Sequence, residues 1–108
     1  MNLRRLAAQL EMEEGEFLEI VELFLEASAS SLGELQSAVE GKDARGAAAA
    51  VHSIKGAAAN LRFTEIFELA QKMEKDACEN RLEEAPYAIR AIQDGLNQIG
   101  ESLKQANR

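Results

Sequence analysis

His52, the only histidine of the chain, is the side chain best suited to carry out chemistry. If its segment forms a helix, its neighbours three and four positions away are Ala48, Ala49, Lys55 and Gly56. Three of these four carry at most a methyl group, so the imidazole should be exposed and a partner protein could approach it closely. A glycine inside a helix lowers the stability by about 1 kcal/mol relative to alanine, so its presence needs a reason. Close approach of a partner's backbone to His52 is such a reason for Gly56.

Lys55 is the only cation among these neighbours. A neutral imidazole has a lone pair that can attack phosphorus, and a nearby positive charge favours the neutral ring. A phosphoryl group on the ring would bring negative charge, which a Lys ammonium one helical turn away could screen and orient. A histidine with these neighbours could carry a phosphoryl group, although a lone histidine on the flank of a helix is usually only a polar surface residue.

From His52 to Leu61 the sequence reads HSIKGAAANL. This segment closely resembles the signature of histidine-containing phosphotransfer (HPt) domains, in which His-x-x-Lys-Gly-x-x-x-Asn is followed by a hydrophobic residue. The long acidic segment from Phe17 to Val39 and the turn from Gly41 to Asp43 are also similar to those of the family. The resemblance covers roughly residues 13 to 82, and the last helix is similar in pattern only.

The resemblance implies a phosphorelay intermediate in which His52 accepts a phosphoryl group from a receiver-domain aspartyl phosphate and donates it to another receiver. Lys55 would stabilise the phosphoryl charge and Gly56 would give access, while Ala48, Ala49 and Ala59 would contribute to partner docking. The implied partners are response-regulator receiver domains and a hybrid sensor kinase. Because the receiver would supply the divalent metal, this chain would bind no cofactor and act as a stoichiometric carrier without kinase activity.

Two further positions follow from the comparison with the family. Arg62 stands where the family usually has Gly, which suits the left-handed conformation at a helix end. Either the turn is made at a cost of order 1 kcal/mol, or the helix ends differently. Glu74 falls in a region that often lies beside the active histidine, so it could orient the imidazole by accepting a hydrogen bond from the ring nitrogen that does not attack phosphorus. Gln71 and Lys72 compete for that role, and a plain exposed Glu74 is the alternative.

Apolar residues spaced three or four positions apart predict the helices that would position these side chains. Four long helices should cover about residues 15–39, 44–61, 64–77 and 86–103, with a short additional helix at residues 2–10. Gly41 should end the first long helix, Asp43 and Thr64 should cap the next two, and Pro86 should lie in the first turn of the last. Because short links make consecutive helices antiparallel, we expect one all-α domain spanning residues 1–108, an up-down-up-down four-helix bundle with a short N-terminal helix.

The first long helix has a continuous apolar stripe that should face the core. The stripe comprises Phe17, Ile20, Val21, Phe24, Leu25, Leu32, Leu35 and Val39. Exposed parts of the first two helices, such as Leu10, Met12 and Phe17, are expected to add to the docking surface around His52.

Bulk properties exclude several classes of function. The formal net charge of −7 would repel nucleic acids. The longest apolar run, Ala47 to Val51, is far too short to span a bilayer, and no secretory signal occurs. Cys78 is alone, which suits a reducing compartment and a small buried or half-buried role. We therefore expect a cytoplasmic monomer, and the start at Met1 indicates a stand-alone carrier.

Two other functions use the same residues differently. A non-phosphorylated helical adaptor could dock a signalling partner through Ala48, Ala49 and Gly56 without using His52. A haem protein could bind iron through His52 and one of Met1, Met12 or Met73, but no Cys-x-x-Cys-His attachment sequence occurs. The sequence supports metal-dependent hydrolysis even less than haem binding, because the carboxylates are spread along exposed faces and do not converge with a histidine. There is also neither a Gly-rich phosphate loop nor a Ser-His-Asp set.

Overall fold

The chain is described by a computed structural model over residues 1–107. Within these residues there are five α-helices and no strand. The helices are α1 (Leu3–Gln9), α2 (Glu14–Glu40), α3 (Ala44–Asn60), α4 (Thr64–Cys78) and α5 (Ala85–Ala106). The predicted boundaries of all five are thus confirmed to within a few residues.

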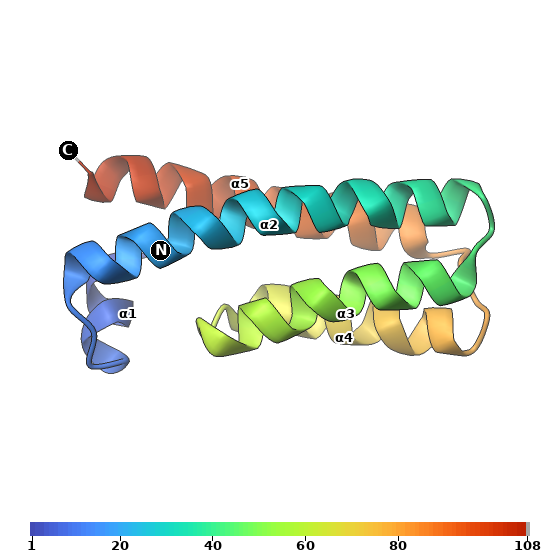
Figure 1. Cartoon of the computed structure of the whole chain (residues 1–108), viewed down its shortest axis with the longest axis horizontal. Coiled ribbons are helices and arrows are strands. Elements are labelled where there is room, and N and C mark those ends of the chain that lie inside the picture. Colours follow the sequence, from blue (N-terminus) through green and yellow to red (C-terminus); the bar gives the residue numbers. More distant parts are fainter. Residues whose placement is uncertain (108) are drawn as a thin grey trace.

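The four long helices run side by side along the long axis of the molecule (Figure 1). α2 contacts α3, α3 contacts α4, α4 contacts α5, and α5 returns to contact α2, so the helices enclose one core in chain order. α1 lies at the end where α2 and α5 extend beyond the other pair, and it contacts only those two within residues 1–107 (Figure 1). The prediction of an all-α bundle with a short N-terminal helix is confirmed.

Most of the predicted apolar stripe of α2 is buried, but Ile20 is an exception. Phe17, Val21 and Leu35 are fully buried, whereas Ile20 is 38% exposed and its neighbour Leu23 is 64% exposed. α2 has 27 residues and its antiparallel partner α3 has 17, so the first turns of α2 lie beyond the end of α3. Ile20 belongs to that overhanging part, and the prediction that it faces the core was wrong.

The first four helices end in the same way. In each, the residue after the C-cap has a positive φ, and the next backbone N–H donates to the carbonyl oxygen five residues earlier, which satisfies a free helix carbonyl. The positive-φ residues are Glu11, Lys42, Arg62 and Asn80, with φ of 56°, 56°, 58° and 59°. Arg62 therefore makes the left-handed turn itself, and the first of the two alternatives for this position holds.

The predicted helix starts are confirmed in two of three cases. The Asp43 side chain accepts a hydrogen bond from the backbone N–H of Gly46 at 2.9 Å, which caps α3, and Pro86 lies in the first turn of α5. Thr64 was wrongly predicted to be a cap. It is the first residue of α4, Phe63 occupies the cap position, and the Thr64 hydroxyl donates to the carbonyl of Arg62 instead.

Candidate functional site

His52 projects from α3 with 65% of its side chain exposed. Ala49 and Gly56, which flank it on the helix, are also exposed. A Cβ atom built on Gly56 would meet nothing within 4 Å, so no contact inside the molecule requires glycine there. The ring is therefore open to solvent, with only small side chains on this flank.

The Glu74 carboxylate on α4 is hydrogen-bonded to one ring nitrogen of His52. Its Oε2 atom lies 2.7 Å from Nδ1 of the imidazole. The pKa of Glu74 is lowered, first by its hydrogen bond with Lys55 and also by that with His52, although partial burial opposes the shift. An ionised carboxylate can only accept hydrogen bonds, so Nδ1 must carry the hydrogen and donate it. In the neutral ring the lone pair is then on Nε2.

Lys55 binds the other oxygen of the same carboxylate. Its Nζ atom donates to Glu74 Oε1 at 2.5 Å. The side chains of Lys55 and Glu74 are 23% and 19% exposed, far less than that of His52. The site thus consists of an exposed imidazole backed by a more shielded ion pair that joins α3 to α4.

The structure brings His52, Lys55 and Glu74 together. The two residues that competed with Glu74 for the place beside the ring, Gln71 and Lys72, are both exposed, and Lys72 pairs with Asp76 at 3.3 Å. The sequence did not indicate that Lys55 binds Glu74. Their separation of 19 positions across two helices gave no local signal.

The residues proposed for docking differ in their exposure. Ala49 and Ala59 are exposed, and Ala48 is half-buried against the core. Leu10 and Met12 are also half-buried, whereas Phe17 is 0% exposed, so the prediction that Phe17 contributes to docking was wrong. The α1 helix packs on α2 in the bundle and helps to close this end of the core.

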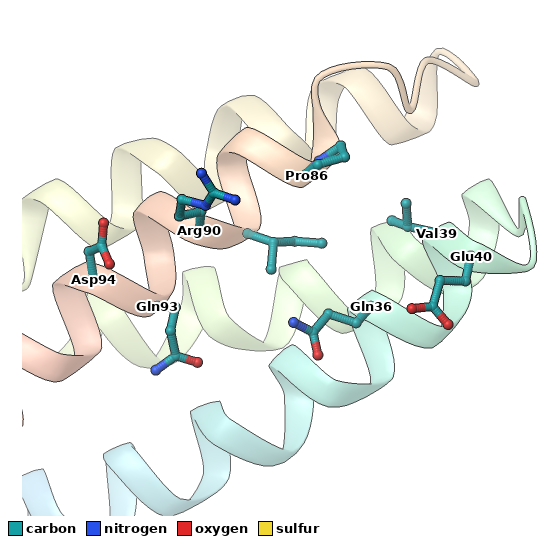
Figure 2. Close-up of a pocket in the computed structure, with 8 residues that line it drawn as sticks. Gln36, Val39, Glu40, Pro86, Arg90, Gln93 and Asp94 are labelled. Carbon is teal, nitrogen blue, oxygen red and sulfur yellow. The ribbon is translucent and has the colours of Figure 1, made fainter.

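Two grooves differ in their relation to His52. A shallow groove of about 900 Å³ between α2 and α3 is lined mostly by small side chains, such as Ala38, Ala49 and Ser53, together with the carboxylates of Glu34 and Asp43. Ser53 is adjacent to His52 in sequence. Figure 2 shows a second hollow, of about 370 Å³, between α2 and α5, with Gln36 and Arg90 at its edges. The residues that line the second hollow all belong to α2 and α5, so of these two grooves only the first adjoins the candidate site.

Several other expectations concern residues outside this cluster. Cys78 is exposed, so its predicted burial was wrong. Met73, a candidate haem ligand, is 2% exposed and packs in the core. Over residues 1–107 no three or more His, Cys, Asp or Glu side chains are grouped so that they could hold a metal ion. No helix in that range is long and apolar enough to cross a membrane.

The fold and the motif around His52 are those of a helical phosphotransfer domain. The family model of the Hpt domain matches residues 19–102, so the chain belongs to the Hpt domain family and has a phosphotransfer role in a two-component phosphorelay. The crystal structure of histidine-containing phosphotransfer protein B (HptB) from Pseudomonas aeruginosa PAO1 is similar, with a TM-score of 0.78 and 27% sequence identity. The match covers 94% of this chain and 89% of that one. A comparison with curated protein sequences found no significant match.

Proposed function

We propose that His52 is the phosphoacceptor and that Nε2 is the atom that carries the phosphoryl group. The observation that carries this proposal is the 2.7 Å contact between Nδ1 and Glu74, because it leaves Nε2 as the nitrogen with the free lone pair on an exposed ring. The donor is an aspartyl phosphate on one receiver domain, and the acceptor is the aspartate of another. A hybrid sensor kinase starts the relay.

Phosphoryl transfer to His52 requires no proton to move. The Nε2 lone pair attacks phosphorus, an N–P bond forms, and the P–O bond to the receiver aspartate breaks and leaves a carboxylate. The ring then carries a hydrogen on Nδ1 and a phosphoryl group on Nε2, and its positive charge is balanced by the ionised Glu74. Donation to the second receiver reverses these bonds, and neutral imidazole leaves while Nδ1 stays bonded to Glu74.

In this mechanism the receiver supplies the divalent metal and the carboxylate, and this chain supplies an oriented nucleophile. It therefore works as a stoichiometric carrier with no cofactor and no kinase activity of its own. Docking of a receiver uses Ala49, Gly56 and Ala59, with Ala48 at the edge. A specific protein interface covers about 800 Å² on each partner, so its footprint extends well beyond one imidazole. The groove between α2 and α3 adjoins the site and offers small side chains to such a footprint.

The test is phosphoryl uptake from a purified receiver domain that has been phosphorylated with radiolabelled acetyl phosphate. We expect acid-labile, base-stable label on the wild-type chain and none on His52→Gln. Two-dimensional ¹H–³¹P NMR of the labelled protein should place the phosphorus on Nε2. Label that persists on His52→Gln refutes the assignment, and phosphorus on Nδ1 refutes the role given to Glu74.

The same variant distinguishes a carrier from an adaptor. A carrier with His52→Gln fails to restore signalling in cells that lack the wild-type protein, although it still binds the receiver. If His52→Gln restores signalling fully, the chain acts through docking alone and the phosphoryl carrier proposal is wrong.

A further inference from the structure

Lys55 does not stand free beside the imidazole. Its Nζ atom is bound to Glu74 Oε1, and three-quarters of its side chain is shielded from solvent. The exposed ring and the Lys55 ammonium are therefore connected through one carboxylate, which contacts Nδ1 with Oε2 and the ammonium with Oε1. The arrangement differs from the expectation that Lys55 serves mainly to meet the phosphoryl group.

The second contact restricts a side chain that is otherwise mobile. Fixing a glutamate side chain costs conformational entropy of about the same size as the stabilisation from one charge-assisted hydrogen bond, so a single contact to an exposed ring leaves the carboxylate free to move. With Lys55 on Oε1, the carboxylate has both oxygens engaged, and its plane and position are set by α3 as well as by α4. The ion pair is also the less exposed part of the site, where solvent screens it least.

The position of Glu74 matters because it determines the tautomer of His52. A free imidazole exchanges between a form with hydrogen on Nδ1 and a form with hydrogen on Nε2. Only the first has a lone pair on Nε2. A carboxylate fixed 2.7 Å from Nδ1 selects that form before any partner binds.

We propose that Lys55 is a positioning residue that acts through Glu74, holding the carboxylate where it keeps the hydrogen on Nδ1 and the lone pair on Nε2. This rests on the proposed function only in taking Nε2 as the reacting atom. The effect on the tautomer belongs to the unphosphorylated protein and does not depend on transfer.

The experiment is ¹⁵N NMR of the full chain labelled at histidine, where His52 gives the only imidazole signals. In the wild type, at a pH alkaline enough for the ring to be neutral, the shifts of Nδ1 and Nε2 should report almost entirely the Nδ1–H form. Lys55→Met should shift a measurable fraction to the Nε2–H form, and Lys55→Arg should restore the wild-type shifts because a guanidinium can also bind Glu74. Lys72→Met is the matched control, since Lys72 pairs with Asp76 on α4 outside the site and should leave the shifts unchanged.

A double-mutant cycle separates positioning from direct phosphoryl contact. In a Glu74→Ala background, Lys55→Met should have no further effect on the tautomer or on the rate of phosphorylation by phosphoramidate, a small donor that needs no docking. In the wild-type background, that rate should fall in proportion to the fraction of the Nδ1–H form that is lost. Lys55→Gln repeats the test if Lys55→Met does not fold.

Two outcomes overturn the inference. One is a wild-type tautomer ratio in Lys55→Met, and the other is an equal rate loss from Lys55→Met with and without Glu74. Both differ from a failure of the proposed function, in which His52 takes up no phosphoryl group although Lys55 still controls its tautomer.

Discussion

Gly56 gives the sharpest test of how the surface beside His52 is used, because its effects on stability and on transfer should have opposite signs. The residue is exposed within α3, its φ is negative, and a Cβ atom there would meet nothing within 4 Å. Alanine in a helix interior is favoured over glycine by about 1 kcal/mol. Gly56→Ala should therefore raise the free energy of unfolding by about 1 kcal/mol and the melting temperature by roughly 4–8 °C.

The same methyl group should impair docking. If a receiver backbone packs against Gly56, an added methyl group costs about 1–3 kcal/mol of overpacking at the interface. That corresponds to a loss of about 5- to 150-fold in kcat/KM for transfer from a phosphorylated receiver. Phosphorylation by phosphoramidate, which is small enough to avoid the methyl group, should proceed at the wild-type rate.

Gly100→Ala is the matched control. Gly100 lies in α5, which is not a direct neighbour of α3 in the bundle, and a Cβ atom on it would also meet nothing within 4 Å. It should give a similar gain in stability, measured by calorimetry or urea denaturation, without changing transfer. Wild-type kcat/KM for Gly56→Ala with a receiver would refute the claim that glycine is there for close approach.

Three further changes test the helix end, the core and the site. Arg62→Gly should raise the free energy of unfolding by about 1 kcal/mol, because φ is 58° there; an unchanged urea midpoint contradicts this. Ser28→Ala should stabilise by about 1 kcal/mol in the same assay, since the hydroxyl is buried without a partner in the described residues; a loss of stability would show that it is satisfied. The pKa of Glu74 is lowered in the folded protein, so its contribution to stability is present above its ordinary value of 4.5 and is lost as pH falls through the lowered pKa. The stability advantage of wild type over Glu74→Gln should therefore shrink below pH 4.5, and an advantage independent of pH would contradict the shift.

Helical periodicity predicted which faces of the helices pack together, but it could not predict where one helix extends beyond the end of its neighbour. The stripe of α2 predicted that Ile20 is buried, but Ile20 lies exposed in the part of α2 that extends beyond α3. The relative lengths of α2 and α3 depend on where each link falls, and that is a property of the assembled bundle. Phe17 lies in the same overhang but is buried, consistent with the packing of α1 on this end.

The candidate site was predictable in its residues and less so in its contacts. The neighbours of His52 on α3 follow from the helix repeat alone, and the structure places Ala49 and Gly56 beside it as expected. The direction of Lys55 does not follow from the repeat. A four-carbon side chain can reach either the phosphoryl position or the adjacent helix, and the Glu74 carboxylate on α4 decides between them.

α2 and α5 extend beyond α3 and α4 at one end of the bundle (Figure 1), and the rate of amide hydrogen exchange should differ between that end and the rest of the molecule. α1 has only seven residues, too few to be stable as an isolated helix, and it is held by burial of Leu3 and Ala7 against α2 and α5. Its amides can become accessible through a local opening that leaves α3 and α4 closed. Local opening at that end of the bundle can therefore occur independently, while the hydrogen bond between His52 on α3 and Glu74 on α4 stays intact.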